Sequence, residues 1–488
     1  MPEDATGLWR LEAAEMARLV AEGSVSSREL VTSCLDRMDA INPIVNAVTE
    51  ARREEALAAA EEADRRRARK ERYGSLHGVP VLIKINIDQR GAATDNGVRT
   101  HRSLVAGQDN PVVANLKRAG AIIIGRTNAP AYSMRWFTDN ELHGLTLNPW
   151  DASKTVGGSS GGTAAAVATG IAPIGHGNDI AGSIRYPAYC CGIVGLKPGY
   201  GRVPSFNATA RGKGSIASQL MAVQGPLTRT VRDARLAFQA MARPSPDDPR
   251  TMIAAPEAEA SHEKRAALVS FDGLGNADGT AAEAVAAAGR KLEAAGYAVE
   301  EVRPPLLEET VAAWPKIAVP DILALLAAPL LESGDRNGAR AVELWRAAWP
   351  GYTARDCLDA VIGRHALLRS WLRLLEKWPI LVMPVSLRPP FAIGSDTRDA
   401  AATAEIIAAQ APMMAVSVLG LPALSVPIRG TASMPGGVQI MAAPGREEAC
   451  LAVGGLLEDA TAPLTPIDPL FDRAAASQAA AVIGVRMP

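Results

Sequence analysis

A run of glycine and serine is the part of the chain whose residue types most directly indicate chemistry. Four glycines surround two serines in residues 157–162, and the helix-forming stretch 163–168 follows at once. A glycine-rich turn at the start of a helix presents backbone N–H groups to an anion. The nucleotide-binding loop of this type ends in Gly-Lys-Ser/Thr, however, and no lysine stands beside Thr163. The run is therefore not expected to bind phosphate.

The same run also fits the nucleophile elbow Gly-x-Ser-x-Gly, with Ser160 at its centre. His176, His262 and His365 follow it and are candidates to complete a Ser-His triad. An elbow comes directly after a strand, whereas the polar segment 151–155 precedes this run. Taken alone, the run is equally consistent with a glycine loop that has no chemical role.

Two further segments stand on either side of the run in the sequence. Lys84 lies in GVPVLIKIN at 78–86, and Ser183 lies in DIAGSIRYPA at 179–188. In this order and spacing the three segments resemble the amidase signature family of serine hydrolases. The resemblance extends over about residues 8–458, with shorter matches at 127–130 (TNAP), 147–150 (LNPW), 195–198 (GLKP), 420–423 (GLPA) and 437–439 (GVQ).

The resemblance implies a Ser–cis-Ser–Lys triad made of Ser183, Ser159 and Lys84. Ser183 would be the nucleophile, and Ser159, after a cis peptide bond from Gly158, would carry its proton to Lys84. A serine hydroxyl needs such a base, and a lysine can be one only when its amine is neutral. Burial away from carboxylates lowers a lysine pKa in this way. Lys84 ends an apolar run, so we expect it to be buried.

The same resemblance implies an oxyanion hole in the segment 179–188, directly after Asp179. The backbone N–H groups of Ile180, Ala181 and Gly182, with that of Ser183, would stabilise the charge that develops on the attacked carbonyl oxygen. Ala181 stands where the family usually has glycine. An alanine still supplies an N–H group, so this departure bears on the substrate range more than on the reaction.

Three residues are expected to support the triad. Asp179 and Arg185 match an acid–base pair of the family, and we interpret both as scaffolding. Ser160 is expected either to hydrogen-bond to Lys84 or to cap the following helix. Two more departures from the family's pattern are Asn178 in place of threonine and Ile85 in place of aspartate.

Residues 131–138 align with a segment that lines the acyl pocket in members of the family. Ser133, Met134, Trp136 and Phe137 are the candidate substrate-binding residues. Arg135 would meet an acid or a carbonyl, or else face water. For the aromatic side chains, ordinary core packing is the competing interpretation.

These residues together predict an amidase that hydrolyses a small apolar or aryl amide through an acyl-enzyme on Ser183, with water as second substrate. A carbamate or ester hydrolase of the same family is an alternative, as is a glutamine-hydrolysing amidotransferase subunit. The apolar wall and the near-neutral charge argue against the amidotransferase. A binding protein without catalysis is a further alternative, which the intact triad disfavours.

The elements that must position these residues alternate between strands and helices. Short apolar runs of strand length occur at 79–87, 121–124, 193–196, 380–385, 424–428 and 438–441. Helical patterns at 111–119 and 163–168 lie between them, which predicts an α/β fold with a central mixed sheet surrounded by helices. We expect one domain over 1–488, with a helical region at about 1–73 that includes a capping box at Ser26, and a linker-like segment at about 243–264.

Composition limits the partners. Lys plus Arg is 51 and Asp plus Glu is 52, so no basic excess indicates nucleic acid. The five scattered cysteines and the acidic start without a secretory signal favour a cytoplasmic protein. Lys316, Asp321 and three prolines interrupt the most apolar stretch, which argues against a membrane span. No metal-ligand spacing is evident. We expect no cofactor, and a monomer or a homodimer.

Overall fold

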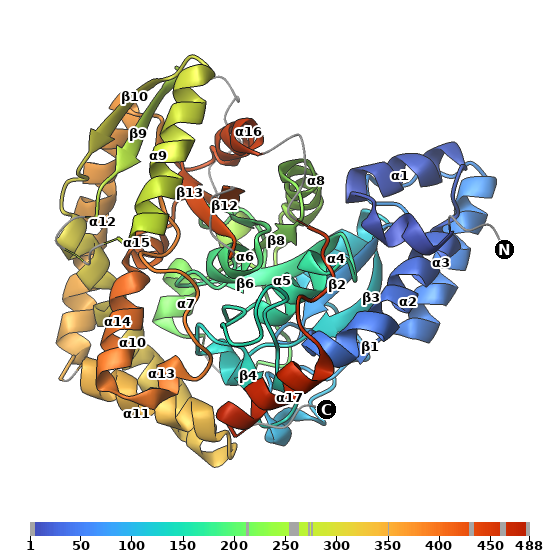
Figure 1. The fold of residues 1–488 in the computed structure, drawn as a ribbon, viewed down its shortest axis with the longest axis horizontal. Coiled ribbons are helices and arrows are strands. Elements are labelled where there is room, and N and C mark those ends of the chain that lie inside the picture. Colours follow the sequence, from blue (N-terminus) through green and yellow to red (C-terminus); the bar gives the residue numbers. More distant parts are fainter. Residues whose placement is uncertain are drawn as a thin grey trace.

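An eleven-stranded mixed sheet with helices on both faces forms the protein (Figure 1). The structure, a computed structural model, describes residues 5–210, 214–252, 263–271, 274, 277–349, 351–428, 434–458 and 465–484. The strand order in the sheet is β1-β3-β2-β6-β8-β7-β12-β13-β11-β9-β10. The fold is α/β with a central mixed sheet, as the sequence predicts.

The strands of the sheet, in chain order, are β1 (Val48–Ala51), β2 (Pro80–Lys84), β3 (Ile122–Thr127), β6 (Ile174–Asp179), β7 (Val194–Lys197), β8 (Val223–Thr228), β9 (Arg265–Val269), β10 (Ala298–Val302), β11 (Ile380–Pro384), β12 (Ala423–Ile428) and β13 (Gly436–Met441). A separate small ladder pairs β4 (Asp139–Asn140) with β5 (Gly144–Leu145). The helices are α1 (Ala13–Glu22), α2 (Ser27–Val45), α3 (Arg53–Ala68), α4 (Pro111–Arg118), α5 (Gly161–Ala168), α6 (Arg185–Cys191), α7 (Ile216–Met221), α8 (Val231–Met241), α9 (Gly279–Ala294), α10 (Leu307–Glu332), α11 (Arg336–Ala348), α12 (Ala354–Lys377), α13 (Ser395–Arg398), α14 (Ala400–Ala409), α15 (Ala411–Leu419), α16 (Glu447–Leu457) and α17 (Arg473–Val482).

All six apolar runs that the sequence marks as strands are strands, but five further strands of the sheet are not apparent from its pattern: β1, β6, β8, β9 and β10. β6 contains two glycines, which have low intrinsic strand preference. Gly175 is needed because α5 packs close to the strand: a Cβ there would lie 2.2 Å from the methyl carbon of Thr163. Tertiary packing therefore selects a strand whose sequence does not indicate one.

The N-terminal region is mostly helical and also contributes a strand. Ser26 caps α2 with the predicted box, in which Glu29 reaches back to the Ser26 N–H. β1 follows α2 and pairs antiparallel with β3 at the edge of the sheet. Of the segment expected to be linker-like, 249–252 form a 3₁₀ turn and 253–262 lie outside the described residues.

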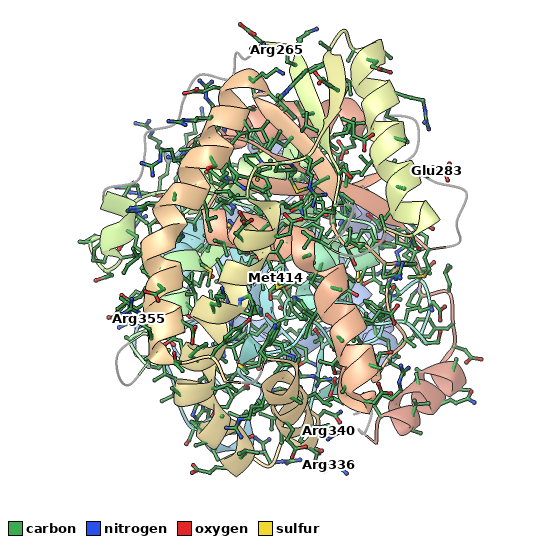
Figure 2. The ribbon with its side chains drawn as sticks, turned by 90° about the vertical axis from the view of Figure 1, so that its left-hand side faces the viewer. Arg265, Glu283, Arg336, Arg340, Arg355 and Met414 are labelled. Atoms are coloured by element: carbon green, nitrogen blue, oxygen red, sulfur yellow. The ribbon has the colours of Figure 1, made fainter. Side chains whose placement is uncertain are left out.

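The core consists of two large clusters of buried apolar side chains. One cluster joins the N-terminal helices, α5, α8, α9 and α16 to the sheet. The other joins α10, α11, α12 and α15 to the aromatic segment near Trp136. Figure 2 faces the helical layer of the second cluster, with Arg336 and Arg340 of α11 at one end and Arg265 of β9 at the other.

α10 is the longest helix of that layer. By length and composition alone it could cross a membrane, as could α14 and α15 taken together as a bent pair. It packs against α11, α12 and α15, and Trp314, Ile317 and Leu330 on it are buried. These contacts are those of a core helix, which passes the same test.

Candidate active site

The ends of two parallel strands bring the predicted residues together. β2 runs parallel to β3 and to β6, and its last residue is Lys84. β6 ends in Asn178 and Asp179. Because the carboxyl ends of parallel strands meet at one edge of a sheet, side chains at these positions share a single site.

Lys84 is fully buried and touches three polar side chains. Its Nζ lies 2.7 Å from Ser159 Oγ, 3.1 Å from Ser160 Oγ and 2.7 Å from Asn178 Oδ1. None of these partners is a carboxylate. Burial therefore dominates and lowers the pKa of Lys84 well below its usual range, although the charge of Asp179 opposes that shift.

Ser159 and Ser160 stand immediately before α5. The peptide bond between Gly158 and Ser159 is cis, as the resemblance implies. A Cβ on Gly162 would lie 2.4 Å from the backbone nitrogen of Asn128, so glycine lets the first turn of α5 approach the end of β3. This close packing places the serines over the end of β2.

Ser183 lies in the loop between β6 and α6 and is almost fully buried. The Ser160 N–H donates to the Ser183 carbonyl oxygen at 3.2 Å, which ties the two serine segments together. Gly182 has φ +109°, and a Cβ there would lie 2.3 Å from the sulfur of Met413. Only glycine fits this turn in front of the candidate nucleophile.

Asp179 and Arg185 form a fully buried ion pair that braces this loop. Arg185 donates from Nη2 to Asp179 Oδ1 at 2.9 Å and from Nε to Oδ2 at 3.0 Å. The guanidinium also donates to Gln439 and Ser417. Although burial of Asp179 opposes the shift, the pair lowers the pKa of that carboxyl to about 2. These contacts fit the expected scaffolding role.

The backbone amides of the loop do not all face the same way. The Gly182 N–H donates to Asp179 Oδ1 at 2.7 Å, so this amide is already occupied and the observed bond does not support its expected oxyanion role. Within the described part of the chain, the N–H groups of Ile180, Ala181 and Ser183 donate to no protein acceptor. These three amides therefore remain the candidates for the predicted oxyanion hole.

A family model described as Amidase matches residues 29–451. The chain belongs to the amidase signature family. It is accordingly an amidase, a hydrolase that acts on amides with water as second substrate.

Similar proteins in this family include enzymes of different specificity. This amidase is 38% identical over 463 residues to an indoleacetamide hydrolase of Bradyrhizobium diazoefficiens, covering 93% of this chain and 87% of that protein. It is 32% identical over 470 residues to one of the subunits of the glutamyl-tRNA(Gln) amidotransferase of Picosynechococcus sp., covering 90% and 95%. The structure of a bacterial aryl acylamidase of the amidase signature family superposes with a TM-score of 0.78 at 26% identity, covering 97% of this chain and 98% of that one.

The aromatic segment of the amidase packs beside the nucleophile loop. Met134, Trp136 and Phe137 are all buried, and the Trp136 indole N–H donates to the Ala181 carbonyl oxygen at 2.9 Å. Trp136 and Trp345 line a cavity of only about 10 Å³, and their ring centroids are 5.8 Å apart. In this structure the aromatic side chains therefore pack as core, directly behind the loop that carries Ser183.

Arg135 in that segment meets acids rather than water. Its guanidinium is 4% exposed and pairs with Asp396, at 2.7 Å from Nε, and with Asp139, at 2.9 Å from Nη1. Burial opposes its charge, but the two carboxylates hold the pKa of Arg135 well above its usual value. The ion pairs fix the segment, and they leave Arg135 no role toward substrate in this arrangement.

Two asparagines near Lys84 belong to the site although the sequence does not mark them as functional. Asn178 accepts from Lys84, and its Nδ2 donates to Asn86 Oδ1 at 3.0 Å. Asn86 in turn donates to Ser133 Oγ at 3.0 Å. A chain of neutral amides thus joins the base to the predicted substrate segment. The only signal in the sequence is that Asn178 departs from the family's threonine.

Of the three histidines considered for a Ser160 triad, the two that the structure describes make no hydrogen bond to Ser160, whose hydroxyl lies by Lys84 and the Asn178 carbonyl oxygen. His176 is fully buried with Nε2 at 2.7 Å from Gln224, and burial lowers its pKa to about 3. His365 lies on α12, and His262 lies outside the described residues. Among the described residues no cluster of His, Cys, Asp and Glu has the arrangement of a metal site.

Proposed function

We propose that this amidase hydrolyses small aryl or apolar amides through an acyl-enzyme on Ser183, with Ser159 as proton carrier and Lys84 as base. One observation carries the proposal: a fully buried lysine amine lies 2.7 Å from a serine hydroxyl and contacts no carboxylate. Burial favours the neutral amine there, which is the form that accepts a proton.

The partners of Lys84 match a neutral amine. Such an amine has two N–H donors and one lone pair. Asn178 Oδ1 can only accept, and Ser160 Oγ can accept because its own hydroxyl is 3.4 Å from the Asn178 carbonyl oxygen. The lone pair is then left for the Ser159 hydroxyl.

The reaction then has two stages. Ser183 Oγ attacks the amide carbonyl while its proton moves to Ser159, and the Ser159 proton moves to Lys84. The same path returns a proton to the leaving nitrogen, so the C–N bond breaks and the amine departs with Ser183 acylated. Water repeats the attack on the ester and releases the carboxylic acid and the free serine. The amides of Ile180, Ala181 and Ser183 stabilise the oxyanion in both stages.

Two findings favour an aryl or apolar substrate. The names of the similar indoleacetamide hydrolase and aryl acylamidase both describe aryl substrates. In this chain four tryptophans cluster behind the nucleophile loop, with ring centroids 5.8–6.3 Å apart: Trp136, Trp314, Trp345 and Trp349. An acyl pocket that opens beside them would be apolar.

The test is hydrolysis of a matched panel, measured as amine or ammonia release and, for the ester, as alcohol release, with Ser183→Ala as the blank. The panel contains an arylacetamide, an anilide, an aliphatic primary amide, a linear dipeptide amide, glutamine, an aryl carbamate and an aryl ester. Preference for the arylacetamide, with no turnover by Ser183→Ala, would support the proposal. A preference for the carbamate or the ester would keep the mechanism and replace the substrate class.

A glutamine-hydrolysing amidotransferase subunit is the second candidate, because the chain is 32% identical to one such protein along nearly its whole length. An amidotransferase subunit would hydrolyse glutamine and no other compound of the panel, and its activity would rise when a partner subunit is supplied. The two candidates are thus separated by one assay.

A further inference from the structure

Two tryptophans donate to two successive carbonyl oxygens of the loop that precedes Ser183. The Trp314 indole N–H donates to the Ile180 oxygen at 2.9 Å, and the Trp136 indole N–H donates to the Ala181 oxygen at 2.9 Å. Trp314 lies on α10 and is 134 residues away from Ile180 in sequence. Both side chains are buried, with 1% and 5% of their surface exposed.

A hydrogen bond to a carbonyl oxygen also orients the next N–H group. The peptide unit is planar, and in a trans peptide the C=O and the N–H point in opposite directions. Trp314 therefore holds the plane that carries the Ala181 N–H. Trp136 holds the plane that carries the Gly182 N–H, and Asp179 holds that plane from its other side.

The two planes consequently differ in how they are fixed. The peptide plane between Ala181 and Gly182 has Trp136 at its carbonyl oxygen and Asp179 at its N–H. It therefore stays in place if one of these two hydrogen bonds is lost. The plane between Ile180 and Ala181 has Trp314 at its carbonyl, and its N–H has no acceptor in the described part of the chain. That N–H is therefore available to an external acceptor such as an oxyanion.

We propose that Trp314 is a positioning residue of the oxyanion hole: its indole N–H holds the Ile180–Ala181 peptide so that the Ala181 amide faces the attacked carbonyl oxygen. The inference rests on the proposed acyl-enzyme mechanism. It makes α10, a helix from the second core cluster, part of the support of the catalytic loop. A preorganised donor is effective because it needs no rearrangement when the charge develops.

The position of Trp314 is itself tightly fixed. Its ring packs 6.3 Å from that of Trp136 and 6.1 Å from that of Trp349, measured between centroids. Pro315 follows it inside α10, and α10 packs against α12 and α15. The donor therefore moves only if the helical layer moves.

Trp314→Phe tests the proposal because it keeps a ring in the cluster and removes the N–H. We expect kcat for the best amide to fall about 10- to 100-fold, less than the loss of a whole oxyanion donor, while KM changes little. The rate of Ser183 phosphonylation by an aryl phosphonate should fall by a similar factor, because the phosphoryl oxygen uses the same amide. The phosphonylation rate should fall less in Trp136→Phe, because the Asp179 carboxylate still holds the peptide between Ala181 and Gly182.

Trp371→Phe is the matched control. Trp371 is also fully buried, and its indole N–H donates at 3.1 Å to Thr310 Oγ1, which lies on α10 one turn before Trp314. Thermal unfolding should show a comparable loss of stability for Trp371→Phe and Trp314→Phe, with kcat reduced only in the latter.

The outcomes separate this inference from the mechanism on which it rests. Wild-type rates of turnover and phosphonylation in folded Trp314→Phe would overturn the inference and leave the mechanism intact. Equal losses in Trp314→Phe and Trp371→Phe would overturn it too, because they would reflect stability alone. If the wild-type enzyme is not phosphonylated at Ser183, the proposed acyl-enzyme itself is wrong.

Discussion

Two lysines of this amidase are buried to the same extent and differ in what surrounds them. Lys84 ends β2 and Lys197 ends β7, and neither side chain is exposed to solvent. Burial lowers the pKa of both, that of Lys197 to about 7. A lysine with a lowered pKa is therefore not by itself evidence of a catalytic base.

The difference lies in the hydrogen-bond partners. Lys197 donates to the backbone carbonyl oxygens of Leu421, at 2.9 Å, and Pro198, at 3.4 Å, and a carbonyl has no proton to give. Lys84 contacts the hydroxyl of Ser159, which has one. A buried amine can act as a base only where a neighbouring group can donate a proton to it.

Replacing each lysine by methionine gives the largest expected contrast. Methionine keeps most of the volume and removes the amine. Lys84→Met should lower kcat/KM about 10²- to 10⁴-fold, the usual contribution of a general base. Lys197→Met should leave kcat/KM of the folded enzyme unchanged. The measurement is amide turnover with the folded fraction set by unfolding in urea, and equal losses in the two variants would remove the distinction drawn here.

Asn178→Asp sharpens the contrast by giving Lys84 the carboxylate that it lacks. An adjacent negative charge favours the protonated amine and should raise the Lys84 pKa by about 1–3 units. Activity needs the neutral amine, so it falls as pH drops through that pKa. The acid limb of the kcat/KM profile should move to higher pH by the same amount, so that activity at a given pH on that limb is about 10- to 1,000-fold lower.

Asn178→Ala is the control for this shift, because it removes the same hydrogen bond without adding charge. Asn178→Ala should lower activity and leave the acid limb of the kcat/KM profile at the wild-type pH or at a lower pH. A limb that stays in place in Asn178→Asp would mean that a group other than Lys84 sets the profile.

Ser160→Ala should have a smaller effect on the Lys84 site. Lys84 keeps Asn178 and Ser159 as partners, so the loss is that of one hydrogen bond, about 2- to 10-fold in kcat. Steady-state turnover measures it directly. If Ser160 were the nucleophile of an elbow, this variant would instead be as inactive as Ser183→Ala.

Lys197 should affect stability and not turnover. An unfolded lysine keeps its proton up to about 10.5, whereas the folded one loses it near 7, so between these values the unfolded state binds more protons and stability rises with pH. One such proton gives a slope of up to about 1.4 kcal/mol per pH unit. Besides burial, Arg185 lowers this pKa, while Asp179 and Glu447 raise it.

Urea unfolding across that range should therefore show a shallower slope for Lys197→Met than for the wild type. Lys84 contributes a slope of the same sign to both proteins, and the difference between them isolates Lys197. Identical slopes would show that Lys197 keeps its proton when the protein folds.

Much of the candidate site could be predicted from local sequence, because its motifs are short and contiguous. The apolar run before Lys84, the serine pair before a helix, and the capping box at Ser26 each indicate their own structure. The ordered spacing of the motifs then gave the candidate triad residues. The expected oxyanion role of Gly182 is less well supported, because its amide is drawn to Asp179 only once the loop has folded.

What the sequence by itself determined is therefore the α/β class, six of the eleven strands of the sheet, and the candidate residues for the chemistry. Only the tertiary structure decided what each of these residues touches: the amide of Asn178 on Lys84, the acids on Arg135, and the indole of Trp314 behind the oxyanion loop. Local patterns report hydrophobic periodicity and turn chemistry over a few residues. Contacts such as that between Arg135 and Asp396, 261 residues apart, leave no such pattern, because they arise from the packing of whole elements.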